Sequence, residues 1–332
     1  MTAVTDDPRR GAWAMPGSAA EQDDAAPPVV AAAPDPGAGD AASAPAGPAS
    51  GAGAGAESVP RVALRPMTVA DVLDGGFAVI KARPRKILGF AAGFVVPVQL
   101  LGAFLQRRVL DDTDSQALIT GDFGALASGA TDGGDLLLAV LVGLLPSLAL
   151  VCVAAGLAHL VAGWVVGRDA PVREMLGVVG RRWWPLLATF VVVHLAEAGG
   201  AIACYIGILF VMPLFVVVAP VIGAEEATTV QALSRATRLV RTRYFPVMGV
   251  AVLMGIVSIV LGYALASVPQ VAALAIGAES GWPLLALAGI LSEVVTTPFV
   301  AAGTVLLYLD LRVRNEGLDI EIAARQLLDL PR

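Results

Sequence analysis

The feature that most constrains this chain is a stretch of about 40 residues, Trp183 to Gly223, that carries almost no charge. A helix in a soluble core rarely needs more than about 14 consecutive apolar residues, whereas a helix that crosses a bilayer needs about 20. The stretch is therefore too long for one crossing and suits two, with a turn at Gly199 and Gly200. Since the chain is 57% hydrophobic and only 15% charged, we predict an all-α integral membrane protein.

Six apolar runs are long enough to cross a membrane when the central stretch is counted as two. They cover about residues 87–106, 136–166, 183–198, 201–222, 247–266 and 283–309. We assign them to one membrane domain at residues 61–324, followed by a C-terminal tail at 325–332. Residues 1–60 are rich in Ala, Pro and Gly, a composition that buries too little apolar surface to offset the entropy of ordering. We predict that this N-terminal tail is disordered.

The basic residues indicate the orientation of these spans. Six crossings place both termini on one side, where 18 of the Lys and Arg residues from Arg61 onward lie, and leave only Arg107 and Arg108 on the other. Because basic loops stay in the cytoplasm, we predict a multi-pass protein of the plasma or inner membrane with both termini cytoplasmic. The basic residues form short clusters beside apolar spans, so the predicted partner is the lipid bilayer and not a nucleic acid.

A basic amphipathic segment, Thr228 to Pro246, leads into the fifth span. Val230 and Leu233 belong to an apolar arc on one side of the predicted helix, and the arginines lie away from that arc or at its border. Helices that lie in the membrane interface have this pattern. We therefore predict that the arginines are cytoplasmic interfacial anchors. They are Arg235, Arg238, Arg241 and Arg243.

Similar segments precede the first and third spans. An offset of 160 residues aligns the first segment with the Thr228 segment, so that Leu73 matches Leu233 and Arg83 matches Arg243. We expect three repeats, each with a cytoplasmic interfacial amphipathic helix and a two-span hairpin. The alternative is that lipid physics gives this pattern to any interfacial helix beside an inward-anchored span.

The first of these segments, Thr68 to Lys81, has a recognisable helix start. Thr68 and Asp71 have the spacing of a capping box, in which side chain and backbone groups bond reciprocally. Gly75 and Gly76 favour an interruption of the helix, because glycine lowers helix stability. The prediction is a helix that begins at Thr68 and is weak at its centre.

Ionisable residues inside spans are costly and are therefore candidate functional residues. His194 lies one turn from Glu197 on the same helix face, and Glu293 lies at a similar depth. The three side chains can hold a proton or a cation between the third and sixth spans. The alternative is structural: Glu197 reaches water near the glycine turn, and Glu293 caps or packs with Thr296 and Thr297.

The sequence shows no pattern typical of an enzyme. It contains no phosphate-binding glycine loop with lysine, no nucleophile elbow and no metalloprotease helix. The two cysteines, Cys152 and Cys204, each lie inside an apolar run, where a free thiol behaves as a small apolar group. We predict no catalytic residues, no cofactor and no metal site.

Three stretches have a more specific character: LRPMTVADVLDGGFAVIKARPRKILG at residues 64–89, RATRLVRTRYFPVMG at 235–249 and LYLDLRVRNEGLDIEIAA at 307–324. In these stretches the chain resembles an actinobacterial integral membrane family that is similar to the membrane domain of glycerophosphodiester phosphodiesterase. Enzymes of that group join this domain to a catalytic barrel whose site uses a His-Arg pair. Here His159 and His194 are both followed by leucine, and no soluble segment can supply a barrel of about 250 residues. The resemblance implies the membrane part alone.

Two hypotheses follow for the function. The first is a non-enzymatic polytopic membrane protein that scaffolds or modulates a membrane or cell-envelope process related to lipids, with a phospholipid or a membrane protein as partner. The alternative is a small transporter. The transporter hypothesis requires a polar cavity between the third and sixth spans that contains at least two of His194, Glu197 and Glu293.

Overall fold

The structure, a computed structural model, describes residues 59–60, 62, 64–109, 133–202 and 206–322. The predicted tails at 1–60 and 325–332 lie outside the described residues, apart from residues 59 and 60. The regular elements within the described part are all helices, which confirms the predicted all-α class. They are α1 (Val69–Ala82), α2 (Pro84–Val109), α5 (Gly133–Val165), α6 (Val172–Arg181), α7 (Trp183–Ile202), α8 (Ile206–Phe215), α9 (Val218–Glu225), α10 (Thr229–Arg241), α11 (Tyr244–Ile276) and α12 (Ala278–Glu316).

Several of these helices are long and apolar enough to cross a membrane. In the described part of the chain five candidates stand alone: Pro84–Leu105, Val140–Val165, Gly207–Glu225, Tyr244–Ile276 and Ser280–Glu316. A sixth is the pair of α6 and the first part of α7, which meet at a bend of 65°. The described residues thus contain five or six helices that could cross a membrane, a range that includes the predicted six, and such helices are typical of a membrane-embedded protein.

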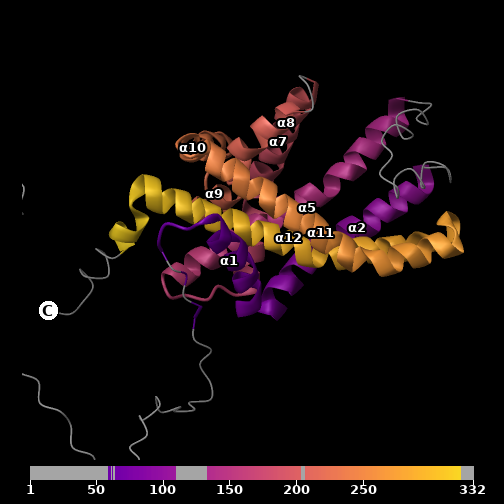
Figure 1. Cartoon of the computed structure of the whole chain (residues 1–332), viewed down its shortest axis with the longest axis horizontal. Helices are drawn as coiled ribbons and strands as arrows, with labels where there is room; N and C mark the ends of the chain where they lie inside the picture. Colours follow the sequence, from indigo (N-terminus) through magenta and orange to yellow (C-terminus); the bar gives the residue numbers. More distant parts are fainter. Residues whose placement is uncertain (1–58, 61, 63, 110–132, 203–205, 323–332) are drawn as a thin grey trace, which may run out of the picture. The chain divides into compact units, whose positions relative to one another are not determined.

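The helices follow one another in a regular order. The short helix α1 precedes α2 and α5, α6 precedes α7 and the broken span α8–α9, and α10 precedes α11 and α12. Figure 1 shows the three long pairs diverging from the end of the bundle that carries the short helices. The short helices α1, α6 and α10 thus share one end, and the long pairs extend away from it.

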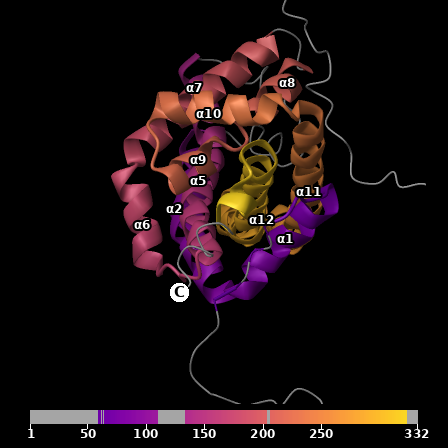
Figure 2. The same cartoon turned by 90° about the vertical axis from the view of Figure 1, so that its left-hand side faces the viewer.

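The last helix, α12, occupies the centre of the bundle. Figure 2 shows the C-terminal part of α12 surrounded by α1, α5, α9, α10 and α11, with α6 farther out beyond α5. Every residue of α12 from 301 to 311 is buried. This part of α12 is apolar on all sides except at Thr304, Tyr308 and Asp310, as expected for a helix enclosed by other helices.

Helix α1 confirms one prediction and differs from another. Thr68 forms the predicted capping box: Asp71 N donates to Thr68 Oγ1 (3.2 Å), and Thr68 N donates to Asp71 Oδ2 (2.8 Å). The helix then continues through Gly75 and Gly76 without interruption. A Cβ atom at Gly76 would lie 3.3 Å from the ring of Phe299 of α12. These glycines therefore allow α1 to lie close against α12, and that packing offsets their low helix propensity.

The junction of α7 and α8 differs from the predicted turn. Helix α7 continues through Gly199 and Gly200 to Ile202, and α8 begins at Ile206. A Cβ atom at Gly207 would lie only 2.2 Å from the carbonyl oxygen of Gly200. The glycines hence serve as the point where two helix backbones touch, a role that small residues often have in membrane proteins.

Helix α10 buries a face that overlaps the predicted arc only in part. Its buried residues are Ala232, Ala236, Leu239 and Val240, while Val230 is 76% exposed. The helix packs on α8, α9 and the end of α12. The predicted arc was based on contact between the helix and lipid. The helix instead packs on protein, and the small side chains of its alanines permit that close contact.

Candidate functional site

Charged side chains gather where the C-terminal part of α12 meets α9 and α10. Arg235 of α10 donates to both carboxylate oxygens of Glu225 of α9, from Nε at 2.9 and 3.0 Å, and also pairs with Glu316 of α12. Tyr308 donates its hydroxyl hydrogen to Glu225 Oε1 (2.7 Å). Arg312 Nε donates to Glu316 Oε2 (3.0 Å). We call these five residues the arginine cluster.

The arginine cluster balances its own charge in a partly buried environment. Its two arginines and two glutamates are each between 20% and 27% exposed. The hydrogen bonds that Arg235 donates to Glu225, opposed by burial and reinforced by those to Glu316, raise the pKa of Arg235 above its ordinary value. Arg235 therefore stays charged, and its guanidinium joins α9, α10 and α12 through bidentate hydrogen bonds.

A second charged pair joins the start of α1 to the end of α12. Asp310 is only 6% exposed. It accepts hydrogen bonds from Met67 N (2.6 Å) and from Arg314 Nε (2.8 and 3.0 Å). Arg314 Nη2 also donates to the Met67 carbonyl oxygen (2.8 Å). The buried carboxylate is thus neutralised and fully engaged, as a charge removed from water requires.

Asn315 makes a third link at the same end of α12. Its side chain amide donates to the carbonyl oxygen of Leu239 (3.0 Å), and its Oδ1 accepts from Thr242 Oγ1 (3.0 Å). We call the arginine cluster, the Asp310–Arg314 pair and Asn315 together the α12 junction. It brings together the three stretches quoted above, residues 64–89, 235–249 and 307–324, which are far apart in the sequence.

Asp169, between α5 and α6, connects another pair of segments. It accepts from Lys86 Nζ (2.7 Å), Trp164 Nε1 (2.9 Å) and Arg83 Nε (3.3 Å). Burial raises the pKa of Asp169, but the hydrogen bonds from Lys86, Trp164 and Arg83 outweigh it and leave the pKa below its ordinary value. The carboxylate thus holds the start of α2 against the loop after α5.

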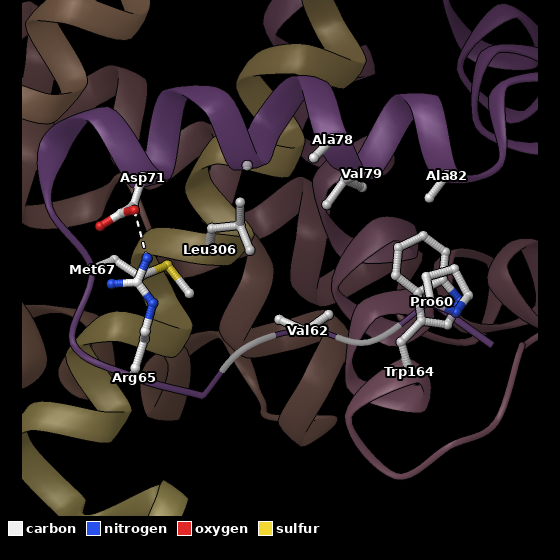
Figure 3. A pocket seen from close by; sticks show the side chains of 11 residues that line it. Pro60, Val62, Arg65, Met67, Asp71, Ala78, Val79, Ala82, Trp164 and Leu306 are labelled. Carbon is white, nitrogen blue, oxygen red and sulfur yellow. Dashed lines mark hydrogen bonds and ion pairs between the residues drawn. The ribbon is translucent and has the colours of Figure 1, made fainter. Parts of the chain in front are cut away.

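A mainly apolar cavity of about 240 Å³ lies between α1 and the segment that leads into it. Figure 3 shows Leu306 of α12 pointing into it from below and Val79 from α1 above, with Trp164 and Pro60 together at one end. At the other end Arg65 Nη2 donates to Asp71 Oδ1 (2.7 Å). This volume is below the roughly 300–1,000 Å³ of typical small-molecule sites. The cavity can hold no more than a short apolar group.

The predicted membrane residues His194 and Glu197 lie together on α7. His194 Nδ1 is 3.7 Å from Glu197 Oε2, and His194 Nε2 forms a hydrogen bond with Ser147 Oγ of α5 (2.7 Å). The imidazole ring also packs on Phe190, with ring centroids 4.4 Å apart. His194 therefore faces α5.

Glu293 lies apart from that pair. It belongs to a hollow of about 400 Å³ between α2, α11 and α12, and α7 contributes no lining residue to it. Its Oε2 accepts a hydrogen bond from Thr297 Oγ1 (2.8 Å). This is the contact predicted if Glu293 has a structural role. The structure thus does not bring Glu293 to His194 and Glu197. The physical reason is that α7 packs on α8 and α5, whereas Glu293 faces α2 and α11.

The four predicted anchor arginines fall into two groups. Arg235 is partly buried within the arginine cluster, Arg243 precedes α11 and is partly exposed, and Arg238 and Arg241 are exposed. Exposure suits the predicted contact with headgroups, whereas Arg235 is engaged inside the protein. Sequence reasoning missed its partners because Glu225 and Glu316 lie in other segments.

Asp310 was also missed, since the last span was expected to end at Leu309. Tyr308, inside that span, was missed because its partner Glu225 lies in another segment. A signal was present in the i, i+4 spacing of Asp310 with Arg314 and of Arg312 with Glu316, which pairs opposite charges on a helix. It predicts a continued helix with paired charges beyond Leu309, as α12 shows.

Comparison with known proteins adds no relative. No protein-family model matches the chain, and neither a curated protein nor a solved structure matches it. The resemblance to the membrane domain of glycerophosphodiester phosphodiesterase therefore stays a prediction. The function must be argued from the geometry of the α12 junction and of the membrane-spanning helices.

Proposed function

We propose that this chain is a non-enzymatic polytopic membrane protein that scaffolds or modulates a lipid-related process of the membrane or cell envelope. The α12 junction carries this proposal. Its charged side chains bond to one another and join α1, α9, α10 and α12. Ionic groups used in this way fix the relative positions of helices, which is what a scaffold requires.

The proposal includes a topology of six crossings in three repeats. The order of elements supports it, because each short helix is followed by two long apolar segments. Exposed aromatic residues, Trp183, Trp184 and Phe245, occur at the starts of α7 and α11. Aromatic side chains at such positions are typical of the membrane interface. In this topology the short helices and both termini lie at the cytoplasmic surface.

The exposed basic residues favour an anionic phospholipid as the first partner. Arg173 of α6 and Arg238 and Arg241 of α10 are exposed at the end that carries the aromatic residues. Each basic residue near an anionic membrane surface contributes about 1 kcal/mol of attraction. We therefore expect the short helices to contact anionic headgroups in the plane of the interface.

Purification in mild detergent followed by mass spectrometry of copurified lipids and proteins tests this function. We expect an anionic phospholipid or a stoichiometric membrane-protein partner with the wild-type chain. The double variant Arg238→Glu with Arg241→Glu should reduce lipid recovery while the protein stays folded. The matched control is Asp74→Asn, an exposed change on α1. Hydrolysis of glycerophosphodiesters by the purified chain would contradict the non-enzymatic proposal.

A further inference from the structure

The hollow between α2, α11 and α12 collects hydrogen-bonding side chains inside a membrane-spanning region. Gln99 comes from α2, Gln270 from α11, and Ser292 and Glu293 from α12. Unsatisfied polar groups are costly in hydrocarbon, and ionisable residues there are typically functional. A hollow of about 400 Å³ is within the range of small-molecule sites. These features point to a polar occupant.

The position of the hollow along the helices indicates how an occupant reaches it. Ser258 and Gln270, which both line it, lie 14 and 26 residues after Tyr244, where α11 begins. At 1.5 Å per residue these distances are roughly 21 and 39 Å along the helix. In the proposed topology Tyr244 lies at the cytoplasmic surface of a hydrocarbon layer about 30 Å thick. The hollow then lies in the half of the membrane away from the short helices and reaches the opposite surface. An occupant can therefore enter from that surface.

Three side chains with hydrogen-bond acceptors distinguish this hollow: the carboxyl group of Glu293, the amide of Gln99 and the hydroxyl of Ser292. Glu293 Oε2 accepts from Thr297, and none of the hydrogen bonds within the described part of the chain uses Glu293 Oε1 or the Gln99 side chain. The Gln99 amide lies against Gly289, where an added Cβ atom would be 2.5 Å from Gln99 Oε1. Likewise the Ser292 hydroxyl lies against Gly262, where an added Cβ atom would be 2.7 Å from Ser292 Oγ. Glycines thus make room for both neutral acceptors beside the carboxylate.

We propose that this hollow binds a primary ammonium group, with Glu293 as its counter-ion and with Gln99 and Ser292 as neutral acceptors. An ammonium group has three N–H donors and no acceptor, which matches one carboxylate oxygen, one amide oxygen and one hydroxyl. A carboxylate repels an anionic group and leaves an apolar group without compensation for the polar lining. The ammonium belongs either to the headgroup of an aminophospholipid or to a small amine dissolved in water.

The test uses the full chain in nanodiscs. In one arm, native mass spectrometry compares the retention of phosphatidylethanolamine with that of phosphatidylcholine with the same acyl chains. Phosphatidylcholine is the control because its quaternary ammonium has no N–H donor. In the other arm, ethanolamine is titrated in phosphatidylcholine nanodiscs by calorimetry. Retention of phosphatidylethanolamine identifies the lipid source, and binding of ethanolamine identifies the soluble one. If neither probe is preferred, the proposal is overturned.

Variants make the test specific to the hollow. Glu293→Gln should weaken binding by about 10-fold or more, because a charge-assisted hydrogen bond is lost. Gly289→Ala, which displaces the flexible end of Gln99 and keeps the charge, should weaken binding by roughly 2- to 5-fold. The matched control is Glu197→Gln, a membrane carboxylate beside His194 and outside the hollow. An equal effect of the two glutamine variants, or none from Glu293→Gln, would overturn the assignment.

Discussion

Charged residues have different partners in the two parts of α12. At the C-terminal end Asp310 pairs with Arg314 and Arg312 pairs with Glu316, and other helices add further partners. Nearer the N-terminal end, Glu293 has a hydrogen bond with Thr297 on its own helix. Paired charges neutralise one another and hold helices together, whereas a carboxylate with neutral neighbours can accept a charged ligand. The first region is thus suited to stability and the second to binding.

The largest effect is expected at Asp310. Asp310→Ala leaves the Arg314 charge without its partner and removes the acceptor of Met67 N. Breaking a buried ion pair from one side typically costs about 3–5 kcal/mol. We expect a loss near 3 kcal/mol in chemical unfolding in detergent, since Arg314 keeps some contact with water. Glu293→Ala should cost clearly less, and the opposite order would contradict the contrast between the two regions.

Arg235 gives the next largest effect and separates the predicted anchors. Arg235→Ala removes the bidentate contact with Glu225 and the pair with Glu316, so we expect a loss of about 2–3 kcal/mol. The control on the same helix is Arg238→Ala, an exposed position that should change stability by no more than about 0.5 kcal/mol. Equal losses in the two variants would contradict the structural role of Arg235 in the arginine cluster.

Close backbone packing near the α12 junction can be tested at Gly223 of α9. An added Cβ atom there would lie 2.1 Å from the carbonyl oxygen of Ala155 in α5. Gly223→Ala should therefore destabilise the fold by about 1–3 kcal/mol through overpacking. Gly249→Ala on α11, where no atom lies within 4 Å, should be neutral or slightly stabilising. Thermal unfolding of the two variants measures the difference, and equal midpoints would be inconsistent with the α5–α9 contact.

The smallest effect concerns pH and Asp169. Because the pKa of Asp169 is lower in the folded protein, its contribution to stability is present above the ordinary carboxyl pKa of about 3.9. That contribution is lost as the pH falls through the folded pKa. Asp169→Asn should therefore be less stable than the wild type at pH 7, and the difference should shrink in acid. Stability curves that stay parallel from pH 7 to pH 3 would contradict the ion pairing with Lys86.

Much of the fold was predictable because single segments encode it. The apolar runs predicted the membrane helices, and Thr68 with Asp71 predicted the start of α1. The predictions that were wrong concerned residues whose structure depends on neighbours from other segments of the chain. Gly76 lies in an intact helix because it packs on Phe299, and Arg235 turns inward because Glu225 and Glu316 lie beside it.

The candidate site was less predictable for the same reason. Depth along each span suggested a cluster of His194, Glu197 and Glu293, and only His194 and Glu197, three residues apart on one helix, are neighbours. Sequence spacing can place side chains on one face of a helix. It does not tell which helix that face contacts, and α7 contacts α5 and α8.

In the proposed topology the short helices share one membrane surface, with the α12 junction at their centre. This topology is tested most directly by single-cysteine labelling in right-side-out and inverted vesicles, with Cys152→Ala and Cys204→Ala as background. Probes at the exposed positions Asp74→Cys in α1, Arg173→Cys in α6 and Arg238→Cys in α10 should all react with a membrane-impermeant maleimide from the cytoplasmic side. Labelling of Arg173→Cys and Arg238→Cys from opposite sides would show an odd number of crossings between them and contradict this topology.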